Sequence, residues 1–237
     1  MDKQAIRQMV WDRLTEARQA AFPLPVHGRI PNFVGAAAAA ARLRELPEWR
    51  RARAVKVNPD APQHPVRLAA ILDGKVLYMP TPRLRAGFLC LRPEWVPPGK
   101  ERYATSIKGM AAFGREVVLE EVEPIDLVVA GSVAVDPLGG RIGKGEGYSD
   151  REYAILRELG HPEMPIVTTV HELQVLDRVP VDPHDIPVDI ICTPERVIRT
   201  HTRYPRPQGI DWSRVTDGEL QAMPPLRQLL ERRLRPR

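Results

Sequence analysis

Residues 126–135 read DLVVAGSVAV, a stretch that stays apolar instead of alternating apolar and polar positions. Strands of this kind are typical of parallel sheets that are buried on both faces. We expect a strand over residues 127–135, and further strands at residues 54–58, 76–80, 117–122, 166–170 and 188–192. Helical spacing between several of these runs predicts helices at residues 66–72, 107–113 and 150–159. This alternation predicts an α/β layer fold with a central, mostly parallel sheet.

The two ends of the chain add helices to this pattern. Residues 3–20 place Ile6, Val10, Leu14 and Ala17 on one helical face, and a proline-rich segment follows them. A second helix is expected over residues 35–46, ended by Pro47, and a final short helix over residues 225–233. The sequence contains no internal repeat and no interdomain linker, so we expect residues 1–237 to form a single domain.

The composition narrows the class of protein. Hydrophobic residues make up 43% and charged residues 27% of the chain, as in soluble globular proteins. No apolar run approaches the ~20 residues that cross a bilayer, and charges occupy the N-terminus where a signal peptide is apolar. We therefore expect a cytoplasmic protein. Cys90 and Cys192 stand alone, which predicts small buried hydrophobic residues and not a disulfide framework or a zinc site.

The net charge of +5 is concentrated at the C-terminus. Residues 226–237, LRQLLERRLRPR, hold five arginines and one glutamate, which gives +4 of that total. We expect a solvated basic tail, because the remaining chain is nearly neutral. Nucleic-acid binding through this tail is an alternative function, although the chain has no basic stripe with interleaved aromatic residues.

A glycine-rich loop follows the predicted strand 127–135. In GRIGKGEGYSDREYA, Gly143, Gly145 and Gly147 alternate with charged residues, and a helix is expected directly afterwards. A strand–loop–helix unit of this kind directs backbone N–H groups and a helix N-terminus at one point, which favours an anion. Arg141 and Lys144 add positive charge beside it. The loop matches neither the P-loop nor the full dinucleotide spacing, so a nucleotide-phosphate site and a turn without function both remain open.

The start of the predicted helix has a structural and a functional interpretation. Ser149 at the N-cap and Glu152 three residues later match a capping box, with Tyr148 and Tyr153 as its hydrophobic staple. Asp150 is poorly placed beside a phosphate unless a divalent cation lies between them, and carboxylate with phosphate oxygens is the usual environment of Mg²⁺.

The same residues resemble a known family. RIGKGEGYSDREYA is similar to the signature R-x-G-x-G-x-G-Y-Y-D of the 5-formyltetrahydrofolate cyclo-ligases, also called methenyltetrahydrofolate synthetases. IDLVVAGSVAVD and HDIPVDIICTP resemble flanking blocks of that family, and Lys3 with Arg7 resembles its first-helix motif. The phrases KVNPDAPQ, PTPRLRAGF and TTVHELQV resemble a divergent branch, the methenyltetrahydrofolate synthetase domain-containing proteins.

The resemblance implies a fold, a reaction and a site. The implied fold is a three-layer α/β/α domain with a mostly parallel sheet, like ribose isomerases and CoA transferases. The implied reaction is the ATP- and Mg²⁺-dependent conversion of 5-formyltetrahydrofolate to 5,10-methenyltetrahydrofolate, a step of one-carbon metabolism. Lys3, Arg7 and Arg141 would hold phosphates, and the loop residues that would wrap them are Gly143, Lys144, Gly145, Glu146 and Gly147. Asp150 and Asp189 would bind magnesium, and Tyr148 with Asp150 would be the catalytic residues.

Two departures from the family pattern leave a rival interpretation open. Ser149 replaces the second tyrosine of the signature, which contributes to the substrate site, and GSVAVD replaces a proline- and phenylalanine-containing motif. The chain is therefore either a cyclo-ligase or a nucleotide-binding paralogue without that activity, with thiamin-related chemistry as one option. His171 and His184 have no second histidine or cysteine at metal-ligating spacing, and we expect structural roles for both.

Overall fold

A computed structural model describes residues 1–235 of the chain. Its central sheet has eight strands in the order β12-β11-β10-β7-β3-β4-β5-β6. The five strands from β11 to β4 run parallel. At the edges the pairing is antiparallel: β12 with β11, β5 with β4, and β6 with β5. The expected mostly parallel α/β sheet is confirmed. Two short hairpins, β1–β2 and β8–β9, lie outside it.

The elements match the sequence pattern most closely where a segment is bounded by turn residues. The strand expected at residues 76–80 and the helix expected at 107–113 have those bounds, and most others are shorter by a few residues. The helices are α1 (Lys3–Glu16), α2 (Ala36–Arg44), α3 (Pro47–Arg51), α4 (His64–Leu72), α5 (Glu101–Ala104), α6 (Ile107–Phe113), α7 (Tyr148–Glu158), α8 (Asp217–Ala222) and α9 (Pro224–Leu234). The strands are β1 (Ala20–Ala21), β2 (Asn32–Phe33), β3 (Ala54–Val57), β4 (Val76–Pro80), β5 (Phe88–Leu91), β6 (Arg115–Val117), β7 (Leu127–Ala130), β8 (Ala134–Val135), β9 (Arg141–Ile142), β10 (Ile166–Thr169), β11 (Ile190–Cys192) and β12 (Val197–Arg199).

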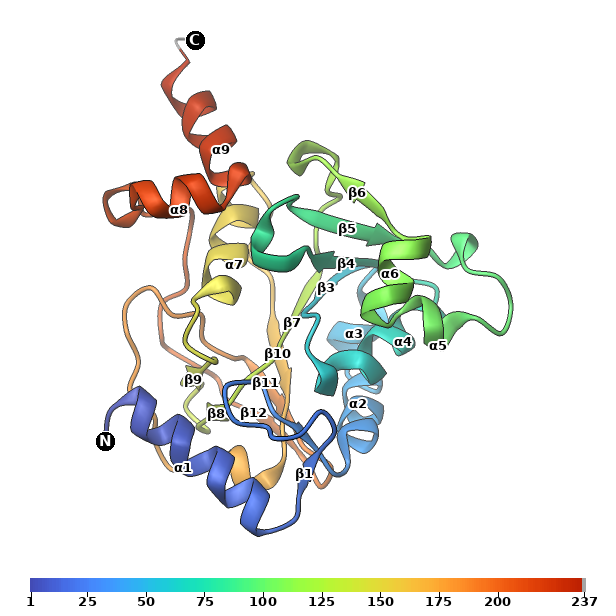
Figure 1. Cartoon of the computed structure of the whole chain (residues 1–237), viewed down its shortest axis with the longest axis vertical. Coiled ribbons are helices and arrows are strands. Elements are labelled where there is room, and N and C mark those ends of the chain that lie inside the picture. The colour runs from blue at the N-terminus through green and yellow to red at the C-terminus, as the bar shows by residue number, and fades with distance from the viewer. Residues whose placement is uncertain (236–237) are drawn as a thin grey trace.

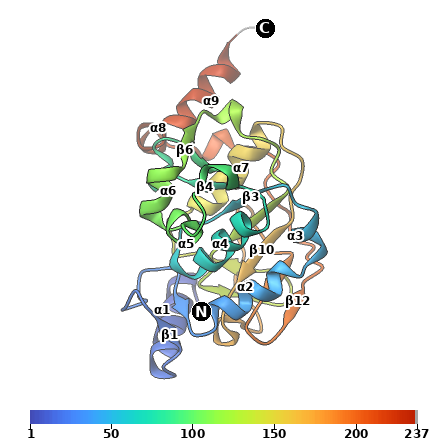
Figure 2. The same ribbon diagram turned by 90° about the vertical axis from the view of Figure 1, so that its right-hand side faces the viewer.

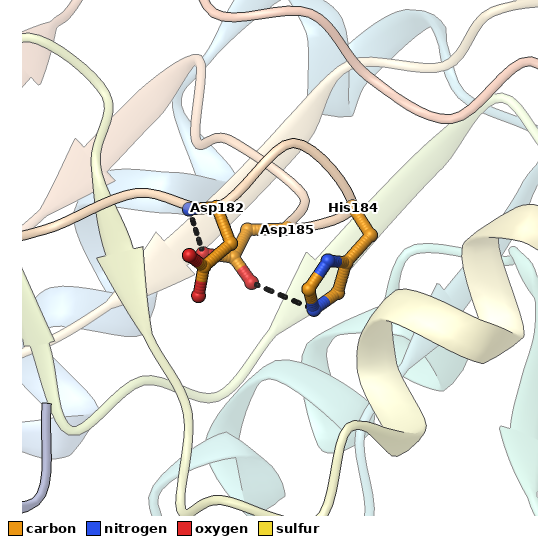
Figure 3. Close-up of side chains that lie close together, drawn as sticks. All are labelled: Asp182, His184 and Asp185. Carbon is orange, nitrogen blue, oxygen red and sulfur yellow. Dashed lines mark hydrogen bonds and ion pairs between the residues drawn. The ribbon is translucent and has the colours of Figure 1, made fainter. Parts of the chain in front are cut away.

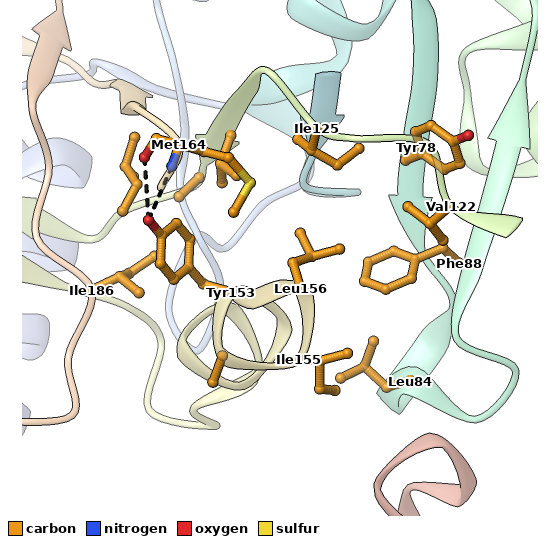
Figure 4. Close-up of a cluster of buried hydrophobic side chains, with 14 of the residues drawn as sticks. Tyr78, Leu84, Phe88, Val122, Ile125, Tyr153, Ile155, Leu156, Met164 and Ile186 are labelled. Carbon is orange, nitrogen blue, oxygen red and sulfur yellow. Dashed lines mark hydrogen bonds between the residues drawn. The ribbon is translucent and has the colours of Figure 1, made fainter. Parts of the chain in front are cut away.

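Helices cover both faces of the sheet (Figures 1 and 2). On one face α7 packs with α9, and the buried side chains of α7 meet those of β4, β5 and the loops beside them. Figure 4 shows Tyr153 and Leu156 of α7 in this cluster, opposite Phe88 and Ile125. On the other face α2, α3, α4 and α6 enclose a second cluster around Trp49. Full burial of a large apolar side chain stabilises the fold by about 1.5–3 kcal/mol.

The strand expected over residues 127–135 is interrupted, which corrects that prediction. β7 ends at Ala130, and β8 leaves the sheet to pair with β9. A Cβ atom at Gly131 would lie 2.8 Å from Gln63 Oε1 and 2.9 Å from Asp60 Oδ2, so any other residue here would force these side chains to move. The Gly131 carbonyl accepts hydrogen bonds from the Arg141 guanidinium instead of from a sheet neighbour. The interruption therefore turns the chain toward the region where Arg141 lies.

Three further differences have local causes. Pro47 does not only end the second helix: it occupies the first turn of α3, where proline fits because its missing N–H has no intrahelical partner. The strand expected at 117–122 is β6, which ends at Val117, followed by a 3-10 turn over Leu119–Glu121. β5 was not predicted from the sequence. Cys90 and Cys192 are buried, as expected.

The C-terminal segment is not a freely solvated tail. Leu226 and Leu229 of α9 are buried in the cluster shared with α7. Arg232 forms an ion pair with Glu120, and Arg233 lies 3.7 Å from Glu158. Residues 236 and 237, which the predicted tail includes, lie outside the described residues. Within residues 1–235, none of the helices combines the length and the apolar character that crossing a bilayer requires.

Candidate functional site

The main cleft lies at the carboxyl ends of the parallel strands, where ligands usually bind in open α/β sheets. Its volume is about 480 Å³. Residues after β3 and β4 form one wall, the glycine-rich loop before α7 forms another, and α1 and the loop before β11 complete it. Ten of the residues expected at the site line it: Lys3, Arg7, Arg141, Gly143, Lys144, Gly145, Glu146, Gly147, Tyr148 and Asp150.

The glycine-rich loop has the backbone of an anion-binding turn. Gly145 and Gly147 have φ angles of +108° and +72°, which non-glycine residues rarely adopt. Gly147 occupies the N-cap of α7, and no side chain caps the helix there. The first N–H groups of α7 are therefore available to a ligand at the mouth of the cleft, where the helix dipole favours an anion.

The predicted capping box is wrong. Because Gly147 is the N-cap, Ser149 is already the second residue of α7, and Glu152 points into the protein. Glu152 forms a buried ion pair with Lys56 of β3. Tyr153 does not staple the helix start either: it is buried, and its hydroxyl lies 3.3 Å from both the backbone nitrogen and the carbonyl oxygen of Met164 (Figure 4).

Three cations of the cleft, Arg7, Arg141 and Lys144, come from different parts of the chain, and each has its own contact. Arg7 Nε of α1 donates to the Gly143 carbonyl at 2.7 Å, which joins α1 to the glycine-rich loop. Arg141 is buried, with Nη1 4.0 Å from Asp150 Oδ1. Lys144 lies on the exposed loop, 3.1 Å from Glu146. This arrangement concentrates positive charge around the loop.

Two half-buried carboxylates face these cations. Asp150 Oδ1 accepts from the Ile186 backbone N–H at 2.8 Å. Burial raises the pKa of Asp150, and nearby Arg141 partly opposes that rise. Burial likewise raises the pKa of Asp60, with Lys144 opposing it most strongly. Sequence reasoning missed Asp60; the available signal was its position just after a predicted buried strand, where parallel-sheet sites gather.

Arg67 holds the turn that presents Asp60. This guanidinium is buried and donates from Nη1 to the carbonyls of Asn58 at 2.7 Å and Asp60 at 3.0 Å. Burial lowers its pKa to about 10. The turn after β3 is therefore fixed from beneath, and its side chains are free to face the cleft.

A third group of polar residues lies at the rim beside α1. Asp182, His184 and Asp185 bring their ligand atoms within 4.8 Å of one another (Figure 3). Lys3 Nζ donates to Asp182 at 2.7 Å and to Asp185 at 2.6 Å, so the first helix is tied to this loop. His184 lines the cleft and is half-exposed, and the structural role expected for it stays a prediction. His171 has that role: its Nδ1 accepts from the Leu173 N–H at 3.0 Å.

Asp189 is not brought to the cleft, although it was expected to bind magnesium. It precedes β11 and therefore lies at the amino ends of the strands, where its carboxylate accepts from the Ile166 N–H at 2.8 Å. Its other oxygen pairs with Arg206 at 2.6 Å. Both carboxylate oxygens thus have structural partners away from the site.

A second cleft of about 500 Å³ adjoins the first. The two share Glu146, Gly147, Asp150 and His184. The far wall of the second cleft comes from the C-terminal segment, through residues between Pro207 and Met223. A ligand bound at the glycine-rich loop would therefore lie next to the second cleft, on the other side of the N-terminus of α7.

Comparisons with known proteins agree with this architecture. Residues 1–194 match the model of the 5-formyltetrahydrofolate cyclo-ligase family. The methenyltetrahydrofolate synthase domain-containing protein of Mus musculus is 47% identical over 98% of this chain and 64% of its own length. The Homo sapiens protein of the same name is 42% identical over 98% of this chain and 62% of its own length. The chain thus spans less than two thirds of these relatives.

A bacterial relative and a solved structure extend the comparison. The 5-formyltetrahydrofolate cyclo-ligase of Mycolicibacterium smegmatis is 30% identical, over 54% of this chain and 68% of the relative. The solution structure of the Aquifex aeolicus 5,10-methenyltetrahydrofolate synthetase superposes with a TM-score of 0.55 and 23% identity, covering 91% of this chain and all of that one. At that identity the superposition supports a common fold.

Proposed function

The chain belongs to the 5-formyltetrahydrofolate cyclo-ligase family, and from that membership we propose that its main cleft binds MgATP and converts 5-formyltetrahydrofolate to 5,10-methenyltetrahydrofolate. One observation carries the proposal: a glycine-rich loop, an uncapped helix N-terminus and the cations Arg7, Arg141 and Lys144 meet in one cleft. Such a set of groups suits a polyphosphate, because backbone N–H groups and guanidinium forks both bind phosphate oxygens.

The reaction needs positioning and charge neutralisation more than a nucleophilic side chain. The formyl oxygen attacks the γ-phosphorus as the bond to the ADP oxygen breaks. N10 of the folate then bonds to the formyl carbon and loses its proton, and the formyl oxygen leaves with the phosphate. Arg141, Lys144 and the loop N–H groups would stabilise the charge that moves onto the phosphate oxygens. Tyr148, an aromatic residue of the cleft wall, is the candidate contact for the second substrate.

The donor set of the cleft also fits magnesium. Asp150 has one carboxylate oxygen without a hydrogen-bond partner among residues 1–235, and Asp185 lies beside it on the same rim. Carboxylates next to phosphate oxygens are the usual ligands of Mg²⁺ in proteins. When bound, the ion neutralises phosphate charge and orients the oxygens for in-line transfer. We assign Asp150 to this role, with Asp185 as a supporting ligand, and withdraw Asp189 from it.

The test is a spectrophotometric assay for methenyl product from 5-formyltetrahydrofolate, with and without ATP. We expect ATP-dependent product from the wild type and a loss of at least about a hundredfold in Asp150→Asn, the size of a removed charge-stabilising contact. The matched control is Asp189→Asn, which removes a carboxylate of the same chain outside the cleft and leaves turnover within about twofold. Equal loss in both variants would remove Asp150 from the site.

A nucleotide-binding paralogue with a different second substrate is the other candidate. Two observations favour it: Ser149 occupies a position where the family signature has tyrosine, and a segment beyond the matched residues 1–194 walls the adjoining cleft. Its expected signature is MgATP binding, seen as a raised melting temperature, without methenyl product. That combination would support the nucleotide site and reject the folate reaction.

A further inference from the structure

Four polar side chains form a hydrogen-bonded row beneath the main cleft. Glu152 of α7 pairs with Lys56 of β3, and Lys56 Nζ donates to Asn58 Oδ1 at 2.8 Å. Asn58 Nδ2 then donates to Ser149 Oγ at 2.9 Å. Lys56, Glu152 and Asn58 are only 1%, 3% and 4% exposed, so each depends on the others for its hydrogen bonds. Ser149 is the partly exposed end of the row, on the cleft wall.

The chemistry of the row fixes its direction. A lysine ammonium has donors only, so the Asn58 group that faces Lys56 must be the carbonyl oxygen. The amide nitrogen therefore faces Ser149, and an amide nitrogen can only donate. Ser149 Oγ is thus an acceptor toward Asn58, and its own proton must point elsewhere. Within residues 1–235, the Ser149 hydroxyl donates to no other group, and the free space beside it is the cleft.

We propose that Ser149 is a substrate-specificity residue that donates its hydroxyl proton to a carbonyl oxygen of the second substrate, in an orientation set by Asn58, Lys56 and Glu152. The inference rests on the proposed function, because the substrate it addresses is 5-formyltetrahydrofolate. The acceptor is a ring or amide carbonyl of that substrate, since the formyl oxygen is the nucleophile of the proposed reaction. Asn58, Lys56 and Glu152 are positioning residues: their hydrogen bonds decide that the serine donates. A ligand with an N–H or an apolar group at this place would leave the hydroxyl unpaired, which disfavours it.

Variants of this row distinguish a serine that donates a hydrogen bond to the substrate from a serine that only fills space. Ser149→Ala removes the donor. Asn58→Asp keeps the serine but changes its direction, because a carboxylate accepts from both Lys56 and the Ser149 hydroxyl and so turns the proton inward. Ser149→Thr retains a hydroxyl and serves as the conservative rescue. Ser106→Ala, which removes a serine at the N-terminus of α6 outside both clefts, is the control for helix-terminal serine loss.

The experiment measures the Kd of 5-formyltetrahydrofolate and, separately, of MgATP by calorimetry for the full chain and these variants, with circular dichroism as the check on folding. We expect Ser149→Ala and Asn58→Asp to weaken 5-formyltetrahydrofolate binding about tenfold, the size of one hydrogen bond. Ser149→Thr and Ser106→Ala should stay within about twofold of wild type, and MgATP binding should change less than twofold throughout.

Three results would overturn the inference, and they are distinguishable. If Ser149→Ala and Asn58→Asp bind 5-formyltetrahydrofolate as tightly as wild type, Ser149 is no donor, while the proposed function stands. If both variants weaken MgATP binding as much as folate binding, the row only supports the shape of the cleft. If the wild type binds MgATP but no 5-formyltetrahydrofolate, the inference fails together with the folate half of the proposed function.

Discussion

Arg7 Nε donates to the Gly143 carbonyl at 2.7 Å, a contact between residues 136 positions apart in the chain. The guanidinium continues along the loop, so that a Cβ atom at Gly145 would lie 3.3 Å from Arg7 Cζ. The first helix thus supports the glycine-rich loop from one side, because Arg7 binds the carbonyl of its first glycine. The loop N–H groups, which would bind an anion, are not used in this contact.

Arg7→Ala should weaken MgATP binding about tenfold, because it removes both a cation and the hydrogen bond that fixes the loop. Calorimetric titration with MgATP measures the change. Arg13→Ala is the matched control, since Arg13 is on the same helix and its side chain has one hydrogen bond among the described residues, to Met9 Sδ at 3.9 Å. An unaltered Kd for Arg7→Ala would mean that the loop keeps its shape without this contact.

Gly145→Ala should reduce MgATP affinity by more than backbone strain explains. Alanine at a φ of +108° is strained, and its Cβ would press on Arg7. Gly160→Ala is the control: its φ is +88°, but nothing lies within 4 Å of the added atom. Both variants should lose about 1 kcal/mol or more of unfolding free energy, measured by urea denaturation. Only Gly145→Ala should change the MgATP titration, and equal effects on binding would speak against a loop-specific role.

Arg141→Ala should cost both stability and ligand binding. The Gly131 carbonyl would lose its buried donor, a penalty of about 1–3 kcal/mol, and the stabilisation by MgATP should shrink. Thermal melts with and without MgATP separate the two effects. Arg206→Ala breaks the Asp189 pair outside the main cleft, so it should lower the melting temperature while the MgATP shift persists. A full shift in Arg141→Ala would exclude Arg141 from phosphate binding.

MgATP affinity should fall on acidification at a higher pH than an ordinary aspartate would produce. Burial raises the pKa of Asp150 above 3.8, so this carboxyl takes up its proton earlier and then no longer serves a cation. The folding stability of the free protein has the opposite pH dependence. Because the folded-state pKa of Asp150 is raised, the contribution of Asp150 to stability is largest below its unfolded-state pKa. That contribution is lost as the pH rises through the folded-state pKa. Titrations from neutral to acidic pH should show the loss of affinity, and Asp150→Asn should lack this step.

Nucleic-acid binding through the C-terminal segment should be weak at physiological salt. Leu226 and Leu229 anchor α9, so the test replaces Arg227, Arg233 and Arg235 by Gln and leaves the anchoring leucines in place. Retention on RNA and DNA at several salt concentrations is the measurement, since phosphate-driven binding falls steeply with salt. Tight, salt-sensitive binding that the triple variant loses would establish a nucleic-acid function that we do not expect.

The features that the sequence predicted correctly are those whose signal lies within a short segment of the chain. The parallel strands and the glycine-rich loop are both of this kind. Apolar runs identified the parallel strands, and the glycines mark backbone angles that other residues avoid, so both signals are present in short segments. The interruption at Gly131 was not predictable in this way, because it depends on Gln63 and Asp60, which approach from elsewhere in the fold.

The candidate site shows the same division. Ser149 and Glu152 have the spacing of a capping box. In the structure Glu152 instead forms an ion pair with buried Lys56 of β3, and Gly147, in a left-handed conformation, is the N-cap. Asp189 has the residue type of a magnesium ligand, yet it lies at the wrong end of its strand. Asn58 acquires its role only when β3 lies beneath α7. Residue type is visible in the sequence, whereas position relative to the sheet edge is not.

The packing of α1 links the cleft to local unfolding. The buried side chains of this helix contact the β8–β9 hairpin and nearby loops, and they form a cluster apart from the two that sandwich the main sheet. We expect a helix attached in this way to unfold locally while the sheet stays folded, at a free-energy cost below that of global unfolding. Because Lys3 and Arg7 leave with it, detachment of α1 removes one wall of the cleft. The hydrogen-exchange rate of the α1 amides and the dissociation rate of a bound ligand should therefore change together.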